Sequence, residues 1–200
     1  MNDITNNEVR FILTVFKNPK TKYNANNLSK VLGISSMGCL NIAKKLEKEK
    51  IISFRQLGKA KFFSIEPEKD YVKDYISFLL KREAEQSIPY IRVWINDLRK
   101  KITRAEIIIL FGSVLTKWDN ANDIDVLLVT KQKDFEKLKK EVENINLISN
   151  KKLHPVYQTL QDLKENIKKQ DPVILNIIRG IVVQGSEKLV EVMINESNEE

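Results

Sequence analysis

The chain reads Ile107-Ile108-Ile109-Leu110-Phe111-Gly112-Ser113 near its middle, an apolar run that ends in a Gly-Ser pair. After nine intervening residues, Asp123-Ile124-Asp125 opens a second apolar run, Val126-Leu127-Leu128-Val129. This order predicts a strand, a tight turn, a short helix and a second strand. Since residues two apart in a strand point to the same side, we expect Asp123 and Asp125 on one face of a sheet and Ile124 in the core.

Two carboxylates held side by side repel each other unless a cation lies between them. Oxygen ligands of this kind suit Mg²⁺, which often takes its remaining ligands from substrate phosphates. Gly112 lets the backbone approach a phosphate closely, and Ser113 offers an N–H and a hydroxyl. The combination predicts a site for a metal and a phosphate, although Asp-x-Asp and Gly-Ser each also occur in ordinary surface strands and turns.

At Gly112, Ser113, Asp123 and Asp125 the chain resembles the DNA polymerase beta-like nucleotidyltransferase superfamily, in its branch of minimal nucleotidyltransferases. The resemblance covers about residues 101–190. It implies that Gly112 and Ser113 contact ATP or another nucleoside triphosphate and that Asp123 and Asp125 hold Mg²⁺. It also implies a third carboxylate on a later strand, where it would help to activate the attacking hydroxyl.

The chain departs from that family pattern in two segments. Residues 114–118, Val-Leu-Thr-Lys-Trp, replace a small, basic, glycine-containing stretch, and the later strand at 152–157 contains no acid. His154 stands about where the third carboxylate is expected; it could accept a proton from a hydroxyl, or it could simply end a strand before Pro155. Two hypotheses follow. The domain is either a degenerate Mg-nucleotide-binding module or an active enzyme that transfers a nucleoside monophosphate to a protein, small-molecule or nucleic-acid hydroxyl.

The net charge of +7 is concentrated in the first half of the chain. Residues 1–100 contain 19 Lys and Arg against 11 Asp and Glu, whereas residues 101–200 contain 15 against 16. A basic first half favours a polyanionic partner. The alternative is a lysine-rich proteome that uses Lys as its default surface residue.

Apolar periodicity predicts three helices in the first half. The first covers residues 8–17, the second runs from a cap at Asn24 or Asn26 to Gly33, and the third runs from a cap at Ser35 or Ser36 to about Lys50. Alternation predicts a hairpin with strands at 51–55 and 61–65. This order resembles the winged helix-turn-helix family over about residues 4–66. The resemblance implies double-stranded DNA as a partner, with a protein–protein module as the alternative. The residues expected at the duplex are Ser36, Met37, Asn41, Lys44, Lys45, Lys48 and, at the wing tip, Lys59.

Residues 67–102 form a predicted helical connector with a break at Pro89. It could pair two chains in a homodimer or pack on its own nucleotidyltransferase domain. We therefore expect an α/β (α+β) protein with four segments: a winged helix-turn-helix domain at 1–66, the connector at 67–102, a nucleotidyltransferase domain with a small mixed sheet at 103–193, and an acidic tail at 194–200.

The single cysteine, Cys39, suits a reducing cytosol, and the chain does not open on a signal peptide. Its apolar runs are far shorter than the roughly 20 residues that a membrane span needs. Together these features predict a cytoplasmic, prokaryotic regulator of the transcriptional or toxin–antitoxin kind, with no membrane partner.

Overall fold

The computed structural model describes residues 4–58, 60–66 and 69–197, and the chain divides into two compact units, residues 1–79 and 80–200. Within the described residues it is a mixed α/β protein of the α+β class, with ten α-helices and two small sheets. The mixed class agrees with the sequence prediction. Among the helices described, none has the length and apolar character needed to span a membrane.

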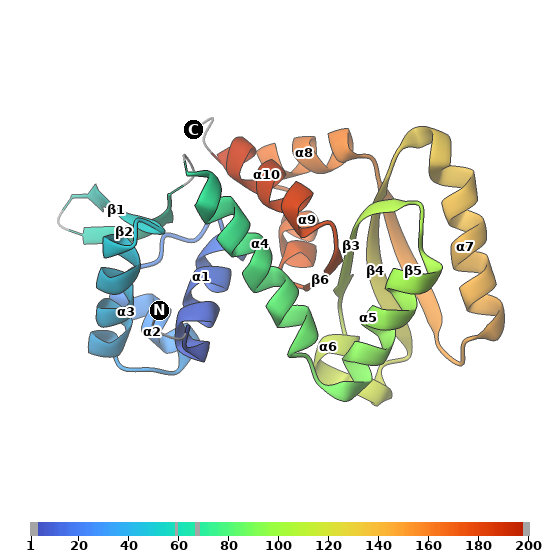
Figure 1. Cartoon of the computed structure of the whole chain (residues 1–200), viewed down its shortest axis with the longest axis horizontal. Coiled ribbons are helices and arrows are strands. Elements are labelled where there is room, and N and C mark those ends of the chain that lie inside the picture. The colour runs from blue at the N-terminus through green and yellow to red at the C-terminus, as the bar shows by residue number, and fades with distance from the viewer. Residues whose placement is uncertain (1–3, 59, 67–68, 198–200) are drawn as a thin grey trace. The chain divides into compact units, whose positions relative to one another are not determined.

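Unit 1 contains three complete helices, a hairpin and the first part of a fourth helix (Figure 1). Their bounds are α1 Asn6–Lys17, α2 Ala25–Leu32, α3 Ser36–Lys48, β1 Ile52–Leu57 and β2 Ala60–Ile65. Side chains at the helix ends explain these bounds, because Thr5 and Asn24 form capping boxes and Ser35 accepts a hydrogen bond from the N–H of Gly38. Gly33 ends α2 in the left-handed conformation that a glycine adopts without strain.

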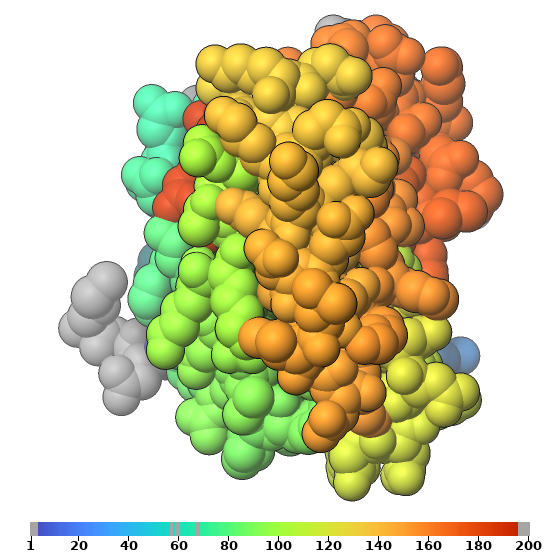
Figure 2. All heavy atoms as spheres, turned by 90° about the vertical axis from the view of Figure 1, so that its right-hand side faces the viewer, coloured from blue at the N-terminus to red at the C-terminus, as the bar shows by residue number. Residues whose placement is uncertain are grey.

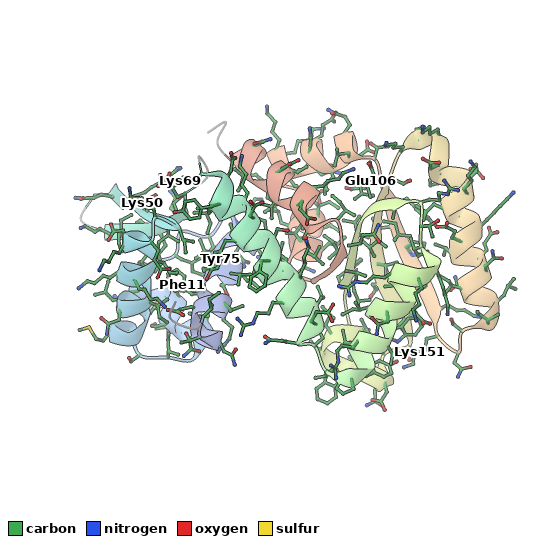
Figure 3. The ribbon with its side chains drawn as sticks, viewed as in Figure 1. Phe11, Lys50, Lys69, Tyr75, Glu106 and Lys151 are labelled. Atoms are coloured by element: carbon green, nitrogen blue, oxygen red, sulfur yellow. The ribbon has the colours of Figure 1, made fainter. Side chains whose placement is uncertain are left out.

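The core of unit 1 lies between the helices and the hairpin. Phe11 of α1, labelled in Figure 3, is fully buried. Its ring centroid lies 5.0 Å from that of Phe63 on β2. On α3 the buried side chains are Cys39, Ala43 and Leu46, at the three- and four-residue spacing that the sequence predicts for its inner face. That spacing leaves the opposite face of α3 exposed.

Helix α4, Asp70–Glu85, runs across the boundary between the units, and the remaining elements belong to unit 2. The helices of unit 2 are α5 Pro89–Lys101, α6 Val114–Lys117, α7 Phe135–Ile148, α8 Leu160–Lys168, α9 Pro172–Ile178 and α10 Ser186–Ser197. Its strands are β3 Ala105–Phe111, β4 Asp123–Thr130, β5 Lys152–Gln158 and β6 Ile181–Gln184, and short 3₁₀ turns lie at Trp118–Asn120 and Gln132–Asp134.

The four strands form one mixed sheet in the order β5-β4-β3-β6, in which only β4 and β5 run parallel. Helices α5 and α7 pack on one face, against a core that includes Ile124, Val126 and Leu128. Helices α8, α9 and α10 contact strands of the same sheet. Figure 2 views unit 2 from the side of α7, whose gold atoms form much of the visible face. Because Asp123 and Asp125 alternate with Ile124 and Val126, their side chains point away from the α5–α7 core.

Most of the predicted connector, residues 67–102, is taken up by α4 and α5. Helix α5 buries Ile91, Ile95 and Leu98 in the core of unit 2, which is the packing alternative that the sequence left open. Phe78 on α4 and Val93 on α5 remain exposed. Pairing of two chains through this segment stays a prediction.

Candidate functional site

Three side chains with metal-binding atoms converge at one end of the sheet of unit 2. Asp123 and Asp125 lie at the start of β4, and the parallel register sets His154 of β5 directly beside Asp125. On its other side Asp125 pairs with Phe111, the last residue of β3 before the Gly112-Ser113 turn. The backbone pairing of three strands therefore brings the turn, the two acids and the histidine to one place.

The distances in this cluster are short. One ligand atom from each of Asp123, Asp125 and His154 lies within 4.8 Å of the other two. The Nδ1 atom of His154 is 3.2 Å from Oδ2 of Asp123 and 4.0 Å from Oδ1 of Asp125. The side chains of Asp123 and Asp125 are 34% and 27% exposed and that of His154 is 67% exposed, so solvent and a ligand can reach all three.

Gly112 lies in contact with the Asp125 carboxylate. Its φ is +78°, and a Cβ atom added there would lie 2.0 Å from Oδ2 of Asp125. The backbone N–H of Ser113 also donates a hydrogen bond to the same carboxylate. The turn therefore holds Asp125, and the predicted contact of Ser113 with a phosphate would compete with this hydrogen bond.

The surroundings of Asp125 disfavour its ionised form. Burial raises the pKa of the Asp125 carboxyl and the neighbouring Asp123 charge raises it further, while His154 and the Ser113 N–H offset part of the rise. A cation bound between the two carboxylates would relieve the repulsion between them. The donor set of two carboxylates and one imidazole thus fits a divalent cation.

No further acid joins this cluster among the residues that the structure describes. The acid on β3, Glu106, lies at the opposite end of the unit from Lys151, whose place beside the cluster is described below (Figure 3). Its carboxylate forms ion pairs with Lys188 and, at 3.9 Å, with Lys131. The third side chain of the cluster is thus an imidazole, that of His154, and not a carboxylate.

The segment between the turn and β4 holds residues that sequence analysis did not assign to the site. Trp118 is exposed and has a φ of +52°, a strained value for a residue other than glycine. The Lys151 ammonium donates hydrogen bonds to the carbonyls of Asp119 and Ala121, the latter at 2.6 Å, at the end of the unit where α6 lies (Figures 1 and 3). Lys151 thereby fixes the residues just before Asp123, a role that spacing in the sequence does not signal.

The residues predicted to contact DNA belong to unit 1. Ser36, Met37, Asn41, Lys44 and Lys48 are all exposed on α3. Lys59 lies outside the described residues. The exposed face of α3 therefore offers one side chain with an amide group, Asn41, and two lysines with exposed side chains.

Lys45 differs from the other lysines of α3. Its Nζ atom lies 2.5 Å from Oε1 of Glu8 on α1, and the Glu8 side chain is buried. Burial opposes ionisation of Glu8, but hydrogen bonds from Lys45 and Thr5 outweigh it and hold the pKa of Glu8 below its ordinary value. The same contact raises the pKa of Lys45. No pattern in the sequence indicates this pair, because the two residues lie on different helices 37 positions apart.

A groove of about 500 Å³ lies between α3, the start of α2 and the hairpin. Lys44 and Lys61 bring two cations to its wall, and Glu47 brings one carboxylate. Its apolar lining includes Leu40, Phe54 and Phe63. Lys44 thus belongs both to the exposed face of α3 and to the rim of this groove.

In comparisons with known proteins, no family model, no curated protein and no solved structure matches this chain.

Proposed function

We propose that the protein is a DNA-binding regulator whose second unit binds a nucleoside triphosphate together with a divalent cation. The observation that carries the proposal is the convergence of Asp123, Asp125 and His154 beside the Gly112-Ser113 turn. The resemblance to minimal nucleotidyltransferases supplies the nucleotide, and the cluster supplies a place for the cation.

Each residue of the cluster has a separate role in this proposal. Asp123 and Asp125 hold the cation, which, when bound, neutralises the charge of the phosphate oxygens that reach it. Gly112 leaves room for the Asp125 carboxylate. When a nucleotide binds, the backbone N–H of Ser113 donates its hydrogen bond to a phosphate oxygen in place of Asp125. His154 completes the ligand set from the edge strand β5.

The replacement of a carboxylate by His154 favours a binding module over an enzyme. A third carboxylate would add negative charge to the site and bind cations more tightly, whereas a neutral imidazole adds none. The alternative is an active transferase. In that reaction a hydroxyl oxygen attacks the α-phosphorus, the bond to the β-phosphate breaks, pyrophosphate leaves, and a base accepts the hydroxyl proton.

Unit 1 supports the DNA-binding part of the proposal through the arrangement of three helices and a hairpin. Helix α3 buries one face in its own unit and exposes Asn41, Lys44 and Lys48 on the other. This is the division that a helix in the major groove requires, since cations contact phosphates and an amide can bind adenine through two hydrogen bonds.

Calorimetry with ATP tests the second unit. We expect ATP to bind in the presence of a divalent cation and binding to be lost with a chelator or in the Asp123→Asn/Asp125→Asn double variant.

Incubation with α-labelled ATP and cell extract then separates the two hypotheses. Label transfer that depends on these aspartates identifies an enzyme, and binding without transfer identifies a binding module. Absence of cation-dependent ATP binding would refute both.

A further inference from the structure

We propose that His154 makes the Asp123–Asp125 cluster select a first-row transition-metal ion, of the Co²⁺ to Zn²⁺ class, over Mg²⁺. This inference rests on the proposed function, because it specifies the cation that the site takes. The proposed cation differs from the Mg²⁺ that the family resemblance implies. The inference follows from His154, a residue at which this chain departs from the family pattern.

The geometry makes His154 a ligand and not a distant neighbour. Its Nδ1 atom lies 3.2 Å from Oδ2 of Asp123, and all three ligand atoms lie within 4.8 Å of one another. Metal–ligand bonds of about 2.0–2.2 Å place a pair of ligand atoms roughly 3–4 Å apart on one ion. Small side-chain movements therefore bring all three atoms onto one ion.

The backbone holds this arrangement. His154 and Asp125 are register partners in the parallel pair of β5 and β4, and Asp123 lies two residues earlier on β4. Since a one-residue slip would turn the side chains of β5 to the other face, the sheet determines that His154 faces the carboxylates. The ligand set is thus a property of the fold and does not depend on a loop.

The chemistry of the donor atoms then determines the preference. Mg²⁺ is bound almost entirely through oxygen and keeps near-ideal octahedral geometry, so an imidazole nitrogen in its shell is unfavourable. Imidazole suits Co²⁺, Ni²⁺ and Zn²⁺, whose affinity for nitrogen ligands exceeds that of the earlier ions. Three protein ligands leave coordination positions for water or for phosphate oxygens, and the exposure of all three side chains leaves these positions accessible.

The test measures Co²⁺ and Mg²⁺ binding by calorimetry, without nucleotide, on full-length protein that carries no histidine tag. Most sites bind Co²⁺ more tightly than Mg²⁺, so the informative quantity is the ratio of the two dissociation constants in wild type and in His154→Asp. The ratio also cancels the added charge of the aspartate, which strengthens binding of both ions. A second variant, His154→Gln, keeps a polar side chain of similar size but removes the imidazole.

We expect His154→Asp to lower the preference for Co²⁺ at least about tenfold, because even loss of a group that only orients a ligand weakens metal affinity by that factor. His154→Gln should weaken Co²⁺ binding by at least the same factor and leave Mg²⁺ binding nearly unchanged. Because His154 is the only histidine in the chain, NMR gives a direct readout. Its ring C–H protons should show large hyperfine shifts in the Co²⁺-loaded protein.

The contrary results are distinct. If both ions bind with a ratio that neither variant changes, and the ring protons of His154 keep their diamagnetic shifts, the inference fails while the metal-binding part of the proposed function stands. If neither ion binds to the wild-type protein without nucleotide, the inference fails, and the calorimetry with ATP decides the proposed function separately. Circular dichroism of each variant establishes that it is folded, which the 67% exposure of the His154 side chain favours.

Discussion

Gly112 and Asp125 lie so close together that a Cβ atom on the glycine would be 2.0 Å from Oδ2 of the aspartate. The turn after β3 and the second acid of β4 are therefore one structural feature, although 13 positions separate the two residues. Any side chain at position 112 would have to displace the carboxylate that the proposed function needs.

Gly112→Ala should therefore abolish binding of the divalent cation as well as destabilise the fold. Gly33→Ala is a matched control, because Gly33 also has a positive φ, +68°, but no atom within 4 Å of an added Cβ. Gly33→Ala should lower the free energy of unfolding only by the strain of the left-handed conformation, about 1–2 kcal/mol. Urea unfolding should show a larger loss for Gly112→Ala than for Gly33→Ala, and calorimetry should show that only Gly33→Ala retains the cation. Equal losses of stability with intact binding would contradict this relationship.

Asp125→Asn should stabilise the metal-free protein. Burial and the charge of Asp123 both disfavour the ionised carboxylate at neutral pH, and an amide of the same shape removes that cost. Removing a functional but unfavourable charge commonly raises stability by roughly 0.5–2 kcal/mol. Thermal unfolding with a chelator should give a higher Tm for the variant than for wild type, while addition of cation should raise the Tm of wild type only. Asp119→Asn, an exposed residue outside the cluster, should change neither value.

Much of this architecture could be predicted from the sequence, because the deciding signals are local. The cap at Ser35 and the alternation around Ile124 depend on neighbours in the chain, and the helix and the strand form where these signals indicate. Asp123 and Asp125 are expected on the same face of the sheet because side chains two residues apart in a strand point to the same side. The structure places both side chains on one face, as predicted.

What the sequence did not show depends on contacts between distant segments. The family resemblance places His154 near the acids, but its exact position beside Asp125 is decided by the register of β5 against β4, which no local pattern encodes. The Glu8–Lys45 ion pair connects two helices. The hydrogen bond from the Lys151 ammonium to the Ala121 carbonyl connects two segments that lie 30 positions apart. Periodicity identifies which face of an element is buried, but not which residue of another element lies opposite.

The Glu8–Lys45 pair should make the stability of unit 1 depend on pH. Because the folded pKa of Glu8 lies below its ordinary value of 4.5, the stabilisation is present above that value and is lost as the pH falls through the folded pKa. Because the folded pKa of Lys45 lies above its ordinary value of 10.5, the same stabilisation is full below 10.5 and is lost as the pH rises through the folded pKa.

Glu8→Gln should consequently lower the free energy of unfolding at pH 7 by about 1.5–3 kcal/mol, the scale of a hydrogen bond to a charged group. The difference from wild type should shrink as the pH falls below 4.5. Chemical denaturation over a series of pH values measures this difference. Glu47→Gln, on the exposed face of α3, provides the control and should remain near wild type throughout. A Glu8→Gln effect that is independent of pH would show that the pair does not account for it.

The lysines of α3 should divide into two groups when DNA binding is measured. Lys44 and Lys48 are exposed, so Lys44→Ala or Lys48→Ala should weaken binding to all duplexes alike and reduce the slope of log affinity against log salt by about 1. Lys45 forms an ion pair with Glu8, so Lys45→Ala should lower thermal stability and change the salt slope less than Lys44→Ala does.

Asn41→Ala should leave the slope unchanged and reduce the difference in affinity between preferred and random sequences, because an amide contacts base edges and not phosphates. Fluorescence anisotropy with labelled duplexes at several salt concentrations measures all four variants. If Lys44→Ala and Lys48→Ala both leave the slope at its wild-type value, α3 is not the surface that meets DNA.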